Sequence, residues 1–248
     1  MIKTDYPVAR QFHSNTSYIA DRLPKAGILQ SGIKPFKEYP RSSRITLPLP
    51  AIPDISFKDV LIGRHSCRQF KNQPVALGEL ADILFAGYGF PKTTTVVRNE
   101  FKQRTVPSAG ALYPLEFYIL VMSVDELAPG IYHYLPQIAQ LEFIHQEPLP
   151  VQLLNRLFLQ QSWITEAGAV IIATAVIERT LSKYLDRGYR YIMLEAGHAF
   201  QNMNLMAAAC KTGAADIGAF LDEEIADLLQ INAGEESPIY AMALGVED

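Results

Sequence analysis

Four short segments of this chain carry residue types that could bind a ligand or move a proton. In the first, 63–70, the side chains of Arg64, Ser66 and Arg68 alternate along the chain. If this segment is extended, alternate side chains project from one face. Two guanidinium groups and a hydroxyl on one face suit a phosphate, because arginine forks match its oxygens. A solvated basic edge strand explains the same spacing equally well.

Two further segments, 107–111 and 213–220, are rich in small residues that could lie close against a flat ligand. Backbone N–H groups of the second segment could also meet an electron-rich ring atom. The residues concerned are Pro107, Ser108, Ala109 and Gly110 in the first segment and Ile217, Gly218 and Ala219 in the second. A plain turn before a strand also explains the first segment. The chain has no phosphate-loop or dinucleotide-binding glycine pattern, so a Rossmann fold is not supported.

The fourth segment contains a lysine beside a tyrosine, Lys183 and Tyr184. Such a pair can share a proton transfer, because a nearby cation stabilises a tyrosinate. A surface lysine next to a tyrosine that is half-buried at the start of a helix is the simpler interpretation of these two residues alone.

Hydrophobic periodicity predicts the elements that must position these segments. The predicted helices are a short one capped by Ser56, then 78–88, 151–161, 189–211 and 221–231. The predicted strands are 116–122, the hairpin 131–135 with 141–144, 169–176 and 238–245. The helix 189–211 is apolar on most faces, so we expect it in a core or a subunit interface, with Gly213 ending it. Mixed helices and strands without regular alternation predict an α+β fold.

The first fifty residues differ from the rest of the chain. Prolines recur there among sparse apolar residues, at Pro7, Pro24, Pro35, Pro40, Pro48, Pro50 and Pro53. Proline fixes φ and removes a backbone donor, so we expect residues 1–53 to form an extended arm that wraps around its own body or a partner subunit. Residues 54–248 then form the ligand-binding domain.

The composition excludes several classes of protein. A net charge of −4 with 49% hydrophobic and 19% charged residues is typical of a globular protein and gives no electrostatic footprint for nucleic acid. The N-terminus lacks the apolar core of a secretory signal, and no apolar stretch is long enough to span a bilayer. The two cysteines, Cys67 and Cys210, lack metal-ligand spacing. We therefore expect a cytoplasmic protein with reduced thiols, no metal site and no membrane contact.

Taken together, these segments resemble one family. The spacing of Arg64, Ser66 and Arg68 looks like the FMN-binding motif of nitroreductases, and the run 107–116, PSAGALYPLE, is close to a signature of the SagB/McbC-type dehydrogenases. The run 182–202, SKYLDRGYRYIMLEAGHAFQN, and the early run 12–16, FHSNT, are also similar to that subgroup. The resemblance covers nearly the whole chain and implies the FMN-dependent nitroreductase fold, with a mostly antiparallel central sheet flanked by helices.

The resemblance also implies a role for each segment. It places the phosphate, ribityl and pyrimidine side of FMN at Arg64, His65, Ser66 and Arg68, and the isoalloxazine ring at Pro107, Ser108, Ala109 and Gly110 of the other subunit of a homodimer. The N5 edge of the ring would lie at Ile217, Gly218 and Ala219, with further polar flavin contacts from Gln201 and Asn204. Proton transfer would fall to Lys183 and Tyr184. One departure is the C-terminus. Many nitroreductases end with a basic residue that meets the phosphate, whereas this chain ends Glu247-Asp248, which leaves Arg64, Arg68, Arg187 or Arg190 for that role.

The expected activity is oxidation of a peptide thiazoline or oxazoline to the aromatic azole. An NAD(P)H-dependent reductase of nitro compounds or quinones is the first alternative, and it would act on a small molecule. The second alternative is a flavin-binding subunit that organises a biosynthetic complex, for which the arm and the apolar helix would provide contacts. A cyclodehydratase is a candidate partner both for an azoline dehydrogenase and for an organising subunit.

Overall fold

A mostly antiparallel sheet forms the centre of the molecule. The computed structural model describes residues 6–18, 34–91, 103–146 and 149–248, and in them eight strands pair in the order β1-β5-β4-β3-β6-β8-β2, with β7 also paired to β8. The strands are β1 (Arg44–Thr46), β2 (Phe70–Lys71), β3 (Leu115–Val121), β4 (Gly130–Leu135), β5 (Gln140–His145), β6 (Ala169–Val176), β7 (Thr212–Ile217) and β8 (Glu236–Glu247). Every pairing between these strands is antiparallel, which confirms the predicted α+β class.

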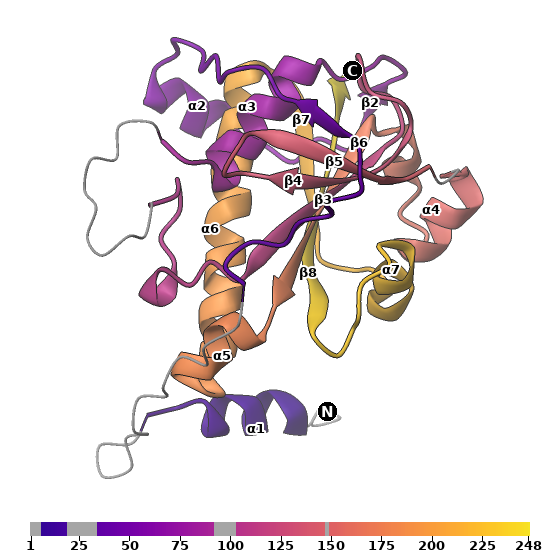
Figure 1. Ribbon diagram of the computed structural model, residues 1–248. Helices are drawn as coiled ribbons and strands as arrows, with labels where there is room; N and C mark the ends of the chain where they lie inside the picture. The colour runs from indigo at the N-terminus through magenta and orange to yellow at the C-terminus, as the bar shows by residue number, and fades with distance from the viewer. Residues whose placement is uncertain (1–5, 19–33, 92–102, 147–148) are drawn as a thin grey trace, which may run out of the picture.

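Helices cover both faces of this sheet, as Figure 1 shows. The long helix α6 and α3 lie on one face, and α4 and α7 lie on the other. The helices are α1 (Pro7–Asn15), α2 (Phe57–Gly63), α3 (Leu77–Tyr88), α4 (Val151–Leu157), α5 (Glu178–Tyr184), α6 (Arg187–Cys210) and α7 (Asp222–Leu228), with short 3₁₀ turns at Ala109–Ala111 and Ser162–Glu166. The result is a three-layer arrangement with a core on each side of the sheet.

Strand β3 illustrates why the central strands are apolar on both sides. Phe117 and Ile119 point into the core shared with α3 and α6, while Tyr118 and Leu120 point into the core shared with α4 and α7. All seven residues of β3 are buried. A strand that is covered on both faces reads as a continuous apolar run, which is why its sequence shows no alternation.

Several predicted boundaries agree with the structure and others need correction. Ser56 caps α2, because its hydroxyl accepts from the Asp59 N–H at 3.1 Å. The long helix ends at Cys210 with Lys211 in the left-handed conformation (φ 60°), so Gly213 does not end it as predicted. Gly213 lies in β7, where a Cβ would approach Cys67 Sγ to 2.9 Å. The segment 213–220, expected to be a flexible loop, is therefore largely a strand.

The N-terminal segment is more structured than its prolines predict. It contains α1, which lies beside α5 at the end of the molecule that is lowest in Figure 1, and β1, which pairs with β5. Residues 19–33 lie outside the described part of the chain. From residue 34 to β1 the arm crosses the sheet face.

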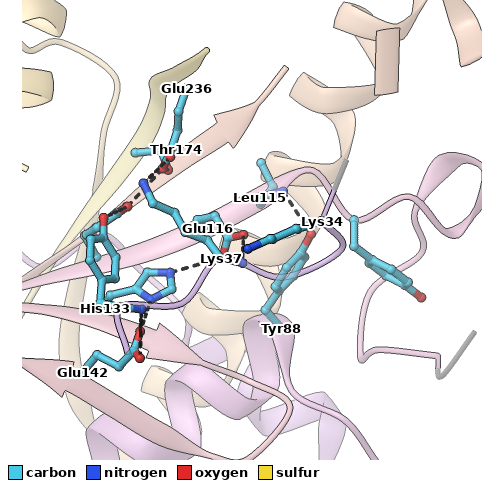
Figure 2. A network of polar contacts seen from close by, with 12 residues as sticks. Lys34, Lys37, Tyr88, Leu115, Glu116, His133, Glu142, Thr174 and Glu236 are labelled. Carbon is cyan, nitrogen blue, oxygen red and sulfur yellow. Dashed lines mark hydrogen bonds and ion pairs between the residues drawn. The ribbon is translucent and has the colours of Figure 1, made fainter. Parts of the chain in front are cut away.

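Buried carboxylates hold this part of the arm on the sheet (Figure 2). Glu116 accepts from the backbone N–H of Lys37 at 3.1 Å, and the Lys37 ammonium lies 2.6 Å from Glu236. Glu142 accepts from the backbone N–H of Tyr39 at 3.0 Å. His133 links two of the carboxylates, at 3.2 Å from Glu116 and 3.1 Å from Glu142. We call Glu116, Glu142, Glu236 and His133 the carboxylate clasp.

Candidate active site

The turn at 107–113 lies directly against the Lys183–Tyr184 pair. Gly110 has φ 63°, and a Cβ built on it would lie 2.8 Å from Lys183 Nζ and 2.8 Å from Tyr184 Oη. Both polar ends therefore converge on the bare Cα of this glycine. The glycine is required twice, because a side chain would disfavour the left-handed backbone and would fill the space that the two polar ends occupy.

Helix α5 presents the pair to the turn. Lys183 and Tyr184 are its last two residues, so Tyr184 ends a helix and does not begin one as the sequence suggested. Both side chains are half-buried. One turn earlier on α5, Arg179 donates to the Tyr113 carbonyl at 3.3 Å and lies 2.6 Å from Glu116. This arginine ties the helix to the turn and to the carboxylate clasp.

The Tyr184 ring packs against a second tyrosine at the start of α6. The rings of Tyr184 and Tyr191 meet edge to face with centroids 5.1 Å apart. Burial and a hydrogen bond that Tyr18 donates to Tyr191 raise the pKa of Tyr18, which follows α1. The Tyr184 ring therefore packs against Tyr191, which is hydrogen-bonded in turn to Tyr18 of the N-terminal segment.

The predicted phosphate-binding segment is extended but is not a strand. Within it Cys67 is buried and Arg64 is half-buried, while His65, Ser66, Arg68 and Gln69 are exposed, so burial does not alternate along the segment. The two arginines have different neighbours: the charge of Arg64 acts on Asp216, and Arg68 lies 5.7 Å from the Trp163 ring. A common face for Arg64, Ser66 and Arg68 therefore stays a prediction.

His65 pairs with the acidic C-terminus. Its Nε2 lies 2.7 Å from Glu247, and its Nδ1 contacts the Gly63 carbonyl at 3.0 Å. The hydrogen bond to the Gly63 carbonyl and the Glu247 carboxylate raise the pKa of this exposed histidine. Glu247, near the acidic C-terminus, therefore has a defined partner.

A cavity of about 200 Å³ lies beside this segment. Among its lining residues are His65, Asn204, Lys211 and Glu247. Lys211 was not predicted from the sequence, where only arginines were candidates for additional phosphate ligands. Its position at the end of the longest predicted helix, immediately before a small-residue segment, was the signal that could have identified it.

Asn204 connects the cavity to β7. Its amide donates to both carboxylate oxygens of Asp216, at 3.0 and 2.9 Å. Burial raises the pKa of Asp216, with Asn204 and the charge of Arg64 opposing the shift. Ile217 is buried at the end of β7, and Gly218 and Ala219 are exposed just after it. The predicted N5-side residues thus follow the cavity along one strand.

The predicted site residues fall into two groups at different heights of α6. The Tyr184 ring lies at Tyr191, near the start of the helix, whereas the cavity lies at Asn204. Thirteen residues separate these two positions, which corresponds to about 20 Å at 1.5 Å per residue. We call the group around Gly110, Lys183 and Tyr184 the turn half-site, and the group around 64–68, Asn204, Lys211 and β7 the cavity half-site.

Other candidates lie outside both half-sites. Arg187 donates to the Thr16 carbonyl at 2.8 Å, and Arg190 donates to Thr16 Oγ1 and to the His13 carbonyl, both at 2.6 Å. These arginines bind the end of α1, and a role for either of them at the phosphate stays a prediction. Gln201 is exposed on α6 between the half-sites.

Comparisons with known proteins agree with this architecture. The model of the nitroreductase family matches residues 61–246. A Methanocaldococcus jannaschii protein named as a nitroreductase is 41% identical over 199 residues, covering 80% of this chain and 95% of that protein. The microcin B17-processing protein McbC of Escherichia coli is 26% identical over 154 residues, which cover 58% of this chain and 54% of McbC.

Solved structures show the same fold. A nitroreductase-type protein from Anabaena variabilis superposes with a TM-score of 0.76 at 26% identity and covers 99% of this chain, which spans 49% of that longer chain. A chain of the E. coli microcin synthetase McbBCD complex with truncated pro-MccB17 bound gives 0.62 at 20% identity, covering 97% and 92% of the two chains. A Desulfovibrio desulfuricans protein in complex with FMN gives 0.51 at 18% identity, covering 76% and 84%.

Across 6–18, 34–91, 103–146 and 149–248, no helix combines the length and apolarity needed to cross a membrane. The same ranges contain no group of three or more side chains placed to hold a metal ion.

Proposed function

The chain belongs to the nitroreductase family of oxidoreductases, and from this premise we propose that it is an FMN-dependent dehydrogenase that oxidises thiazoline or oxazoline rings in peptides to azoles. The observation that carries the proposal is that Lys183 Nζ and Tyr184 Oη both lie where a side chain of Gly110 would begin. A reductase that needs only an open flavin face has no use for a lysine and a tyrosine converging on one turn.

The residues of the cavity half-site suit FMN. Lys211 lines the cavity, and Arg64 and Ser66 lie in the segment that passes beside it, so a phosphate there would have cationic and hydroxyl donors within the same region. The small residues Gly213 and Ala214 of β7, which also line the cavity, leave room for a ribityl chain and ring edge. Glu247 is hydrogen-bonded to His65 beside the cavity, and protonation of this histidine would offset its charge. When bound, FMN would supply the acceptor for the hydride equivalent that leaves the substrate ring.

The turn half-site supplies the proton chemistry. Aromatisation of an azoline removes a proton from one ring carbon and a hydride equivalent from its neighbour. Tyr184 takes the proton at its phenol oxygen, and the Lys183 ammonium beside it offsets the negative charge that the oxygen carries as a base. The turn and the Tyr191 ring fix the direction of the phenol, so the protein contributes alignment of proton loss with hydride loss.

A homodimer would complete this site, with the turn half-site of one subunit facing the cavity half-site of the other. The separation of about 20 Å between the half-sites within one chain supports this arrangement. The McbBCD structure suggests that a peptide substrate reaches the enzyme within a larger assembly, so a cyclodehydratase is a candidate partner. We place the protein in the cytoplasm.

The first experiment is a visible spectrum of the purified protein, with mass identification of any released cofactor. Azoline-containing peptides are then tested for the loss of two hydrogen atoms by mass spectrometry under air. Lys183→Ala and Tyr184→Phe are expected to abolish this loss while flavin binding persists. Glu178→Gln, an exposed change at the start of the same helix, is the matched control. Azoline oxidation that survives both changes overturns the assignment.

An NAD(P)H-dependent reductase of nitro compounds or quinones is the second candidate, favoured by the 41% identity to the M. jannaschii protein named as a nitroreductase. Rapid bleaching of the flavin by NADPH, without dependence on Tyr184, would identify it. A flavin-binding organising subunit is the third, favoured by the likeness to a chain of the McbBCD complex. It would bind FMN and turn over only after partner proteins are added.

A further inference from the structure

The backbone of the turn half-site adopts conformations that L-amino acids rarely occupy. Gly110 has φ 63°, and two residues with side chains, Ala111 and Tyr113, have φ 55° and 46°. Left-handed backbone at non-glycine residues persists only where the surroundings impose it. Something outside the turn must therefore hold it in the shape that meets Lys183 and Tyr184.

Hydrogen bonds from the turn converge on one buried carboxylate. The N–H of Tyr113 donates to Ser108 Oγ at 2.9 Å, and the N–H of Leu115 donates to Tyr88 Oη at 3.2 Å. Tyr88 Oη in turn donates to Glu195 Oε1 at 2.5 Å, and Ser108 also bonds to Glu195. Each hydroxyl accepts a hydrogen bond from the backbone and donates one to Glu195. Two chains thus connect the ends of the turn to α6.

We propose that Glu195 is a positioning residue for the dehydrogenation proposed above: through Ser108 and Tyr88 it fixes the strained turn whose Gly110 lies against Lys183 and Tyr184. The expected effect of Glu195 on the reaction rate rests on the proposed function, whereas its expected effect on the turn does not depend on that function. Glu195 is 3% exposed and touches neither the Lys183–Tyr184 pair nor the cavity lining among the contacts of the described residues.

The charge of Glu195 can change near neutral pH. Burial raises the pKa of Glu195 to about 7, although hydrogen bonds from Ser108 and Tyr88 and the charge of Arg104 oppose the shift. These three residues are the polar and charged groups that face it, from the turn, from α3 and from the segment before the turn. Burial also raises the pKa of Tyr88, so its hydroxyl keeps the proton that it donates.

The sign of the pH effect follows from the donors. An ionised Glu195 accepts from both hydroxyls at once. A protonated Glu195 must itself donate a hydrogen bond, so one of the two hydrogen bonds that it accepts, from Ser108 or from Tyr88, must weaken or reverse its direction. The turn is therefore held most firmly above pH 7, and it loosens as the pH falls through the pKa of Glu195.

The test uses the flavin-loaded protein and two readouts between pH 5.5 and 8.5. The first is amide hydrogen exchange of residues 107–115, corrected for the intrinsic effect of pH. The second is the ratio of azoline oxidation rates between the wild type and Glu195→Gln. We expect exchange in the wild type to rise severalfold below a midpoint near pH 7, no such midpoint in Glu195→Gln, and a rate ratio that follows the same midpoint.

Two further variants keep the test decisive. Ser108→Ala removes one hydrogen-bond chain without burying an unpaired charge, and it should raise exchange across the whole pH range. Asp82→Asn removes a buried carboxylate of α3 that binds the N–H of Ala51 instead of the turn, and it should leave exchange at 107–115 unchanged.

The possible failures are distinct. Exchange that is independent of pH in the wild type and insensitive to Ser108→Ala overturns the positioning role, even if azolines are oxidised. A midpoint in exchange without any azoline oxidation overturns the proposed function and leaves the turn assignment standing. A constant rate ratio in an active enzyme overturns the link between the turn and the reaction.

Discussion

At the scale of single residues, the proposed proton transfer depends on Gly110 having no side chain. Its missing side chain leaves the space into which Lys183 Nζ and Tyr184 Oη project. The Gly110→Ala substitution should displace both ends and add about 1–2 kcal/mol of backbone strain. We expect kcat/KM for azoline oxidation to fall roughly 10- to 100-fold, because small misplacements of reacting groups are costly. Steady-state kinetics and thermal unfolding measure the two effects.

Gly78→Ala is the matched control for this change. Gly78 lies in the first turn of α3, and a Cβ there would meet no atom within 4 Å. The substitution should stabilise the protein by up to about 1 kcal/mol, because alanine favours helix over glycine. Unchanged activity in both glycine variants would contradict the role assigned to Gly110.

Glu195 should also affect stability with a sign opposite to that of most carboxylates. Its folded pKa of about 7 lies above the ordinary value of 4.5, so the folded state binds its proton more tightly than the unfolded state. The contribution to stability is complete below pH 4.5 and is lost as the pH rises through 7. Relative to Glu195→Gln, the wild type should lose at most about 3 kcal/mol between pH 4.5 and pH 8.5.

Urea unfolding of both proteins at several pH values measures this difference. Comparing the two proteins at each pH cancels the titration of all other groups. A stability difference that stays constant, or that grows in favour of the wild type above pH 7, would contradict the raised pKa.

At the scale of elements, the carboxylate clasp determines how the N-terminal segment lies on the sheet. Glu142 is fully buried and accepts from the Tyr39 N–H, from Arg44 at 2.9 Å and from His133. Burial alone would raise the pKa of Glu142, but these hydrogen bonds lower it. Glu142→Gln should destabilise the protein by about 2–4 kcal/mol, because it leaves donors and a buried cation without their anion.

The same change should expose the arm to protease. We expect trypsin to cleave after Lys37, Arg41 or Arg44 faster in Glu142→Gln than in the wild type, at equal fractions of global unfolding. The stability difference should shrink below pH 4.5, because the contribution of a carboxylate with a lowered pKa is lost as it becomes protonated. Equal cleavage rates at neutral pH would show that the clasp does not hold the arm.

Helix α1 is attached in a different way, through polar contacts at its C-terminal end. None of its residues is buried, while Arg187 and Arg190 donate to the carbonyls of Thr16 and His13. Cations at a helix C-terminus also oppose its negative dipole end. Arg187→Ala with Arg190→Ala should release α1 but change the global unfolding free energy by less than about 1 kcal/mol.

Hydrogen exchange measures this release. Amides of 10–15 should lose their protection in the double variant, while those of β3 and β6 keep it. Arg156→Ala, which breaks the exposed pair with Glu224, is the control and should leave α1 unchanged. Retained protection in α1 would place its stabilising contacts elsewhere.

Elements with strong local signals were predictable, and elements made by distant contacts were not. The uninterrupted apolar run 169–176 and the period of 78–88 correspond to β6 and α3 within one residue. In contrast, β7 consists mainly of small residues with low strand propensity, and it forms because it pairs with β8 along its length while Ala214 packs into the core shared with α6. The helix α1 escaped detection because its contacts come from arginines more than 170 residues away.

The candidate site shows the same division. The resemblance implied roles for Gly110, Lys183 and Tyr184, and in the structure the polar ends of the last two lie where a Gly110 side chain would begin. That the three residues act in one site stays a prediction. Neither spacing nor resemblance gave a role to Glu195, although it lies within the run 182–202. Its importance depends on burial against Tyr88 and Ser108, which no local pattern encodes.

At the scale of the whole molecule, the separation of the half-sites by about 20 Å along α6 predicts that a complete site needs two copies of the chain. One copy would supply Arg64 and Lys211, and the other would supply Gly110, Lys183 and Tyr184. Complementation between two inactive variants tests this directly. The variant Arg64→Ala with Lys211→Ala lacks the cavity half-site, and Tyr184→Phe lacks the base.

Equal amounts of the two variants are unfolded together and refolded with FMN. If partners assort at random in a two-fold dimer, half of the dimers are mixed, and each mixed dimer has one intact site and one doubly defective site. Azoline oxidation should then recover to about a quarter of the wild-type rate. A site built within one chain gives no recovery, because every site in every dimer still carries one defect. Recovery therefore separates a shared site from two adjacent single-chain sites, even though both arrangements would elute as dimers.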